Sequence, residues 1–92
     1  MIRTLRHKGL KRFFEDGDSS KLRQDLVERI AILLAALDEA PAIRAMDRPG
    51  FRLHPLKGDL AGYWAVVVRA NWRIVFHFED ATVADVDLVD YH

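Results

Sequence analysis

The residues of this chain whose side chains could perform chemistry gather in its second half. They are His54, Lys57, Asn71, Arg73, His77, Asp90, Tyr91 and His92. Cleavage of a phosphodiester through a ribose 2′-hydroxyl needs a proton acceptor, a cation beside the phosphate and an acid for the leaving 5′-oxygen. Histidine and aspartate can act as acceptor and acid, while arginine and lysine suit the phosphate. The set is therefore chemically sufficient without a metal or a cofactor.

Motifs of other enzyme classes are absent from the sequence. It has no glycine-rich phosphate loop, HExxH helix, GxSxG elbow or histidine pair at metal-ligand spacing. Each polar residue also has an ordinary structural explanation. Arg73 and Lys57 fit solvated positions in a strand and a turn, and His77 fits an exposed strand face. Asp90 could cap or form an ion pair. Spacing by itself leaves both interpretations open.

Length and composition predict one cytoplasmic domain. Ninety-two residues suffice for one domain and not for two. The absence of cysteine excludes disulfides and thiolate metal sites. The longest apolar run, residues 30–37, is too short to cross a bilayer. Arg3 and Arg6 lie where a signal peptide would need apolar residues. We therefore expect no membrane association.

Charge is balanced overall and unevenly placed. Fourteen basic residues match fourteen acidic ones. Residues 1–14 contain basic residues and no acid, whereas residues 79–92 contain acids and no lysine or arginine. This asymmetry permits a basic face for a polyanion, although zero net charge argues against strong non-specific nucleic-acid binding. A mixed, solvated surface explains the same pattern.

Two helices are expected in the first half, after a short strand at residues 2–6. Apolar residues at helical spacing, followed by Gly17 at a C-cap position, predict a helix over about 8–16. A longer helix is predicted by apolar residues that recur along one face, namely Leu22, Leu26, Ile30, Leu33 and Leu37. Its N-cap candidates are Asp18, Ser19 and Ser20. It should end at 38–40, before Pro41, and residues 41–50 should form a connection with room for one helical turn.

The second half changes to the two-residue period of strands. Strands are predicted at residues 51–55, 63–69, 72–78 and 82–90, with turns at 57–59, 70–71 and 80–81. Trp72, Ile74, Phe76 and Phe78 should face the helices, so Arg73, Val75 and His77 should face away. Trp64, Trp72 and the phenylalanines are assigned to the core. The predicted fold is α+β, with two N-terminal helices packed on one face of a curled, mainly antiparallel sheet.

The whole chain resembles the HigB toxins of the RelE superfamily. The resemblance is carried by His7-Lys8-Gly9-Leu10-Lys11, the helix that ends Leu33-Leu34-Ala35-Ala36-Leu37-Asp38, and the segment from Met46 to Asp59 that contains Pro49-Gly50-Phe51-Arg52-Leu53-His54-Pro55-Leu56-Lys57-Gly58. It continues through Asn71-Trp72-Arg73-Ile74-Val75-Phe76 to the terminal Asp90-Tyr91-His92. The ordered combination is specific, whereas any one motif alone is weak.

The resemblance implies a RelE-like fold and a toxin of a type II toxin–antitoxin system. Such a toxin is a metal-independent endoribonuclease that cleaves mRNA in the A site of the 70S ribosome by 2′-hydroxyl attack. The implied partner is a HigA-like helix-turn-helix antitoxin, and DNA is contacted only through that antitoxin. RelE-like toxins are commonly basic, and this chain is neutral, which predicts weaker ribosome affinity and milder toxicity.

The resemblance also assigns roles to residues. His54, Asp90, Tyr91 and His92 match the catalytic cluster of the family. Either Asp90 or His54 would accept the proton, His92 would act as the acid, and Tyr91 would help to place the RNA. Lys57, Arg73 and Asn71 match positions expected to hold the phosphate and the RNA.

Two other functions compete with this interpretation. The chain could be a RelE-fold protein with weak or no catalysis that acts with its antitoxin at DNA. It could also be a metal-free RNA-binding domain with no toxin role. The matching catalytic residues favour the enzyme over the first, and the absence of exposed aromatic stacking rows disfavours the second.

Overall fold

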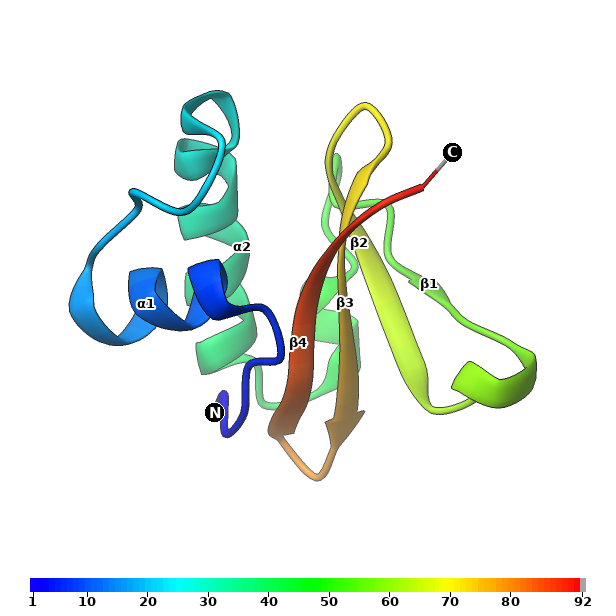
Figure 1. Cartoon of the computed structure of the whole chain (residues 1–92). Coiled ribbons are helices and arrows are strands. Elements are labelled where there is room, and N and C mark those ends of the chain that lie inside the picture. The colour runs from blue at the N-terminus through cyan, green and yellow to red at the C-terminus, as the bar shows by residue number, and fades with distance from the viewer. Residues whose placement is uncertain (92) are drawn as a thin grey trace.

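The computed structural model describes residues 1–91 and forms two layers. The helices α1 (Lys8–Asp16) and α2 (Val27–Glu39) lie on one side of a four-stranded antiparallel sheet (Figure 1). The sheet has the order β1-β2-β3-β4. Its strands are β1 (His54–Pro55), β2 (Tyr63–Arg69), β3 (Trp72–Glu79) and β4 (Thr82–Asp90). The predicted α+β arrangement is confirmed.

Helix α1 has the predicted bounds and a cap at each end. The ring Nδ1 of His7 accepts a hydrogen bond from the backbone N–H of Leu10 at 3.2 Å. Gly17 ends the helix with a φ of 73° and donates its backbone N–H to the carbonyl of Phe13 at 3.0 Å. Only glycine adopts this left-handed conformation without a steric cost, so the C-cap prediction is confirmed.

The predicted start of the second helix is wrong. A 3₁₀ turn (Gln24–Leu26) precedes α2, and no side chain caps either element. Asp18 instead closes a local turn, because its carboxylate accepts the N–H of Ser20 at 3.0 Å and pairs with Arg12 at 2.9 Å. The hydrogen bonds from Ser20 are the main cause of a lowered pKa of Asp18. Leu22 is buried, yet it lies outside the helix.

Both hairpin turns occur where they are predicted, but the first strand is shorter. Phe51 is 4% exposed and turns into the core, and its carbonyl accepts the N–H of Val67 at 2.9 Å. Arg52 then takes a positive φ of 52°, which breaks the extended run. The strand predicted at 51–55 is therefore reduced to β1. The connection before it holds the expected helical turn, a 3₁₀ segment at Ile43–Met46.

The N-terminal segment pairs with β4 at two separate points rather than as a strand. Ile2 and Leu5 form parallel bridges with Val83 and Val86. Between these points β4 carries a bulge, since the β3–β4 register shifts between Val75 and His77. An extra residue in one strand interrupts a continuous ladder. The strand predicted at 2–6 is therefore not formed.

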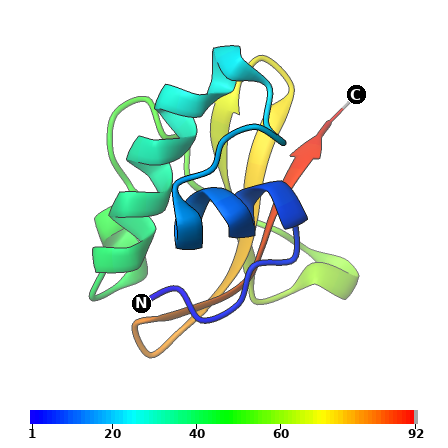
Figure 2. The same cartoon turned by 60° about the vertical axis from the view of Figure 1, so that its left-hand side comes forward.

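The core lies between the helices and the inner face of the sheet. Ile74 and Phe76 are fully buried, and Trp64, Trp72 and Phe78 pack partly buried against them. Figure 2 shows α1 and α2 in front of the strands that they cover. Phe14 is 36% exposed, so assigning every phenylalanine to the core was wrong for this residue. Among residues 1–91, no helix is long and apolar enough to cross a membrane.

Candidate active site

The outer face of the sheet, away from the helices, carries most of the predicted site. Register places His54, Ala65, Val75 and Asp87 in one row across the four strands. Arg73 lies two residues from Val75 and therefore shares its face. Val75 is 8% exposed, yet it is not part of the core cluster beneath the sheet. The prediction that Arg73, Val75 and His77 face away from the helices is confirmed.

Arg73, Tyr91 and Asn71 are tied together at one edge of this face. The guanidinium carbon of Arg73 lies 5.9 Å from the centroid of the Tyr91 ring. Nη1 of Arg73 donates to the carbonyl oxygens of Ala70 at 2.6 Å and Trp72 at 3.2 Å. The backbone N–H of Tyr91 donates to the carbonyl of Asn71 at 2.8 Å. The β2–β3 hairpin thus holds both the cation and the end of the chain.

His54 lies at the opposite edge of the same face, and Lys57 follows β1 by two residues. Nδ1 of His54 lies 2.9 Å from the carbonyl of Arg52. A carbonyl only accepts, so in the neutral ring this hydrogen bond places the proton on Nδ1 and leaves the Nε2 lone pair available. Lys57 is exposed and precedes a 3₁₀ turn (Gly58–Leu60). The fold therefore sets both residues apart from Arg73.

No contact within residues 1–91 joins His54 or Lys57 to Arg73 or Tyr91. Two strand spacings separate β1 from β3, which is roughly 10 Å. Asp90 is opposite Trp72 in the register, on the side away from Arg73. His92 lies outside the described residues. The structure brings together three of the predicted site residues and leaves His54 apart from them.

A cleft of about 160 Å³ opens on the outer face beside Tyr91. It is lined by Arg6, Leu60, Tyr63, Val75, Asp85, Asp87, Val89 and Tyr91, of which only Tyr91 belongs to the predicted site. The sequence could have predicted that Asp87 points outward, because it lies between Val86 and Leu88, which are buried. Arg6 and Leu60 carried no such signal, because they reach the cleft from segments outside the sheet.

Asp85 is held at one end of the cleft in an unusual backbone conformation. It lies at the bulge of β4 with a φ of 55°. Its Oδ2 accepts the Tyr63 hydroxyl at 2.7 Å and lies 3.9 Å from Nη2 of Arg6. This hydrogen bond to the Asp85 carboxylate is the main reason that the pKa of Tyr63 is raised above 10.0, so the phenol remains a donor at neutral pH. Bulges commonly redirect a side chain beside a functional site.

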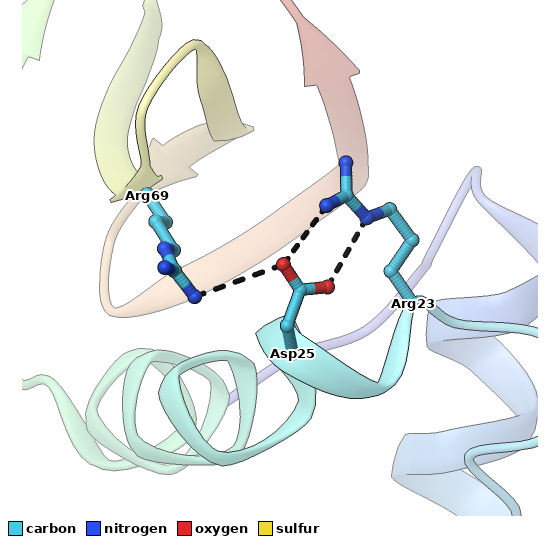
Figure 3. A network of polar contacts seen from close by, with 3 residues as sticks. All are labelled: Arg23, Asp25 and Arg69. Atoms are coloured by element: carbon cyan, nitrogen blue, oxygen red, sulfur yellow. Dashed lines mark hydrogen bonds and ion pairs between the residues drawn. The ribbon is translucent and has the colours of Figure 1, made fainter.

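An ion-pair network braces the hairpin that carries Asn71 and Arg73. Arg23 donates to both carboxylate oxygens of Asp25, at 3.1 and 2.9 Å. Arg69, at the end of β2, lies 3.7 Å from the same carboxylate (Figure 3). Arg23 also lies 5.9 Å from the Trp72 ring centroid. These contacts connect the hairpin to the segment that begins α2.

Within the described residues, no group of three or more histidine, aspartate or glutamate side chains could hold a metal ion. The described part of the site consists of a half-buried arginine, an aromatic wall, a histidine and carboxylates. Arginine binds phosphate oxygens through paired N–H groups, and the available Nε2 of His54 can take a proton. The arrangement suits a phosphodiester substrate.

Comparison with known proteins gives a family and a fold. Residues 3–92 match the sequence profile of a family described as RelE-like toxins of the type II toxin–antitoxin system HigB. Endoribonuclease HigB from Proteus vulgaris is 46% identical over 92 residues, which is 100% of both chains.

Two solved structures show the same fold. A mutant of YafQ from E. coli has a TM-score of 0.64 at 16% identity, over 98% of this chain and 91% of that one. The YoeB–YefM toxin–antitoxin complex from Staphylococcus aureus has a TM-score of 0.63 at 21% identity, over 100% of this chain and 95% of the matched chain. At such identities the likeness shows the fold alone, and it confirms the expected RelE-like architecture.

Proposed function

The chain belongs to the HigB family of RelE-like toxins of type II toxin–antitoxin systems, and we propose that it is an endoribonuclease that cleaves mRNA in the ribosomal A site. The full-length identity of 46% to an endoribonuclease supports the reaction class. The observation that carries the proposal is the contact of Arg73 with Tyr91, on the same outer face of the sheet as His54.

His54 is the proposed proton acceptor. Its Nδ1 is engaged by the Arg52 carbonyl, so Nε2 is the atom that would take the ribose 2′-proton. Asp90, the alternative acceptor, is paired in the register with Trp72 on the side away from Arg73. The geometry therefore favours His54. His92 remains the proposed acid for the leaving 5′-oxygen.

Arg73 and Lys57 would stabilise the phosphate from opposite edges. Nη1 of Arg73 is fixed by two carbonyls, so the remaining N–H groups of the guanidinium are preorganised for a phosphate. Lys57 is exposed and would approach from the β1 side. Tyr91 and Asn71 would place the RNA beside them. In this reaction the 2′-oxygen attacks phosphorus and the 5′-oxygen leaves as a hydroxyl, with no metal required.

The separation of these groups supports the proposed ribosome dependence. The two edges of the site are roughly 10 Å apart, and net charge is zero. Such a surface attracts free RNA weakly. Helix α1 with its basic residues lies on the side of the sheet away from the site (Figure 1). Of the basic residues in the segment 1–14, only Arg6 lines the cleft. The ribosome would supply the positioning that the protein lacks.

The proposed partner is a HigA-like helix-turn-helix antitoxin, through which the complex would contact DNA. Membership of a toxin–antitoxin family supports such a partner. A homologous fold is seen in the YoeB–YefM complex. Action on ribosomes places the protein in the cytoplasm, with no role for a membrane.

Single-turnover cleavage tests the reaction. Purified protein should cut mRNA in a programmed 70S complex and leave free RNA largely intact. Arg73→Ala should slow cleavage roughly 10²–10³-fold, because it removes a fixed donor to developing charge. Melting temperature and antitoxin binding control for folding. Equal cleavage of free and ribosomal RNA would contradict A-site action. No cleavage of either RNA by folded protein would favour the antitoxin-dependent binding protein instead.

A further inference from the structure

The orientation of His54 depends on the residues that lead into β1. The strand itself has only two residues, and the ring Nδ1 of His54 lies 2.9 Å from the carbonyl oxygen of Arg52. Arg52 has a φ of 52°, in the left-handed region. A residue other than glycine keeps such a conformation only where the surrounding structure holds it there. The hydrogen bond to His54 therefore requires that residues 48–52 be fixed from outside.

Residues 48–51 form a turn that closes on itself and lies at the surface. The backbone N–H of Phe51 donates to the carbonyl of Arg48 at 3.0 Å, and Gly50 takes a φ of 87°. Proline followed by a glycine at positive φ is the sequence of a type II turn. Arg48, Pro49 and Gly50 are all exposed. The position of this turn against the sheet must come from contacts with other segments.

Arg29, on helix α2, makes those contacts. Its Nη2 donates to the carbonyl oxygens of Gly50 at 2.7 Å and Val67 at 3.3 Å. Its guanidinium carbon lies 5.1 Å from the centroid of the Phe51 ring. The backbone N–H of Val67 also donates to the carbonyl of Phe51, at 2.9 Å. One side chain thus connects α2, β2 and the residues immediately before Arg52.

The charge of Arg29 serves these backbone contacts and no ion pair. Within residues 1–91, none of the ion pairs includes Arg29. The residue is half-buried, where a charge is costly unless its N–H groups are hydrogen-bonded. Hydrogen bonds from an ionised donor are also stronger than those between neutral groups. Arg29 is therefore well suited to cross-link two backbone segments.

We propose that Arg29 is a positioning residue for the cleavage reaction, because it fixes Gly50 and Phe51 against β2. The Arg52 carbonyl is thereby held where it keeps the proton of the neutral His54 ring on Nδ1. Without that acceptor the proton is shared between the two ring nitrogens, and a ring with its proton on Nε2 cannot accept another one there. The inference rests on the proposed function, in which Nε2 of His54 takes the ribose 2′-proton.

Arg29→Met tests the assignment, because methionine keeps an apolar stem and removes every donor. Arg48→Met is the matched control. The guanidinium carbon of Arg48 lies 5.5 Å from the centroid of the same Phe51 ring, but its Nε donates to the carbonyl of Ala45, at 3.2 Å, and not to the residues after the turn. Both variants lose one positive charge, so a general effect of charge on ribosome binding should appear in both.

Two measurements are made on the full-length proteins. The ¹⁵N chemical shifts of the His54 ring, recorded without ribosomes at about pH 8.5, where imidazole side chains are ordinarily neutral, report which nitrogen carries the proton. Wild type and Arg48→Met should carry it on Nδ1, and Arg29→Met should show both forms. Single-turnover cleavage at saturating programmed ribosomes should be roughly 10–10²-fold slower for Arg29→Met than for Arg48→Met. The ribosome concentration at half-saturation should be similar for the two variants.

The two measurements separate this inference from the proposed function. Slower cleavage by Arg29→Met with the proton still on Nδ1 would overturn the positioning role and leave the endoribonuclease standing. A changed proton position with an unchanged rate would support the positioning of the ring and remove His54 as the proton acceptor. A wild-type ring with its proton on Nε2 would overturn the inference even if Arg29→Met did not fold.

Discussion

The two faces of the sheet are made from alternate residues of the same strands, and they have different roles. On the inner face Ile74 and Phe76 are fully buried against α2 and its neighbours. On the outer face Arg73, His77 and Asp87 are half-buried and reach solvent. Because successive side chains point to opposite faces, a single strand supports the fold with one set and the site with the other. Substitutions on the two faces should therefore affect separate quantities.

The outer face is itself divided between a braced edge and a loose one. The edge with Arg73 and Tyr91 is fixed by hydrogen bonds to the β2–β3 hairpin. The edge with His54 lies on a strand of two residues, paired only with β2. Groups that stabilise charge act best when they are preorganised. We infer that the phosphate is held at the braced edge.

The largest effect is expected at the loose edge. His54→Gln should slow single-turnover cleavage by roughly 10²–10⁴-fold, because it removes the proposed proton acceptor. Unfolding free energy should scarcely change, since His54 is half-buried and outside the core cluster. His77→Gln is the matched control on the same face, where the ring contacts Tyr63 at 5.2 Å between centroids. Similar rates for both variants would remove His54 from the mechanism.

On the inner face a substitution should reduce the stability of the fold rather than the rate of cleavage. Phe76→Ala should reduce the free energy of unfolding by about 3–5 kcal/mol, since the ring is fully buried. Phe14→Ala removes the same group from a position that is 36% exposed, so it should cost less, about 1–2 kcal/mol. Urea unfolding measures both. The comparison of faces would fail if Phe76→Ala slowed cleavage per folded molecule as much as His54→Gln.

The smallest effect is expected at the brace of the hairpin. Asp25→Asn removes the carboxylate shared by Arg23 and Arg69, whose side chains are 60% and 66% exposed. Exposed ion pairs contribute about 0.2–1 kcal/mol, and salt weakens them. Thermal unfolding at low and high salt should show a loss that shrinks as salt rises. Asp47→Asn is the control, because Asp47 forms no ion pair within residues 1–91. A larger, salt-independent loss would indicate a packing defect instead.

Local patterns in the sequence predicted the helix at 8–16, the two hairpins and the outward position of Arg73 and His77. Each depends on a period or on a single turn residue, such as Gly17, and these act over a few neighbouring residues. The resemblance added the roles proposed for His54 and the C-terminal residues. The register places Asp90 on the side away from Arg73, and the roles of all these residues stay predictions.

Other features were decided only by packing between distant segments. Helix α2 begins after Leu22, although the sequence pattern included this residue in the helix. Leu22 is buried in the core from the segment that precedes the helix. Arg6 meets Asp85 because the N-terminal segment pairs with β4 on both sides of its bulge. A bulge and a parallel bridge join residues far apart in the chain, and neither leaves a periodic trace in the sequence. The sequence by itself therefore determined that Arg73 and His77 face away from the helices, and tertiary structure decided that this face holds a cleft.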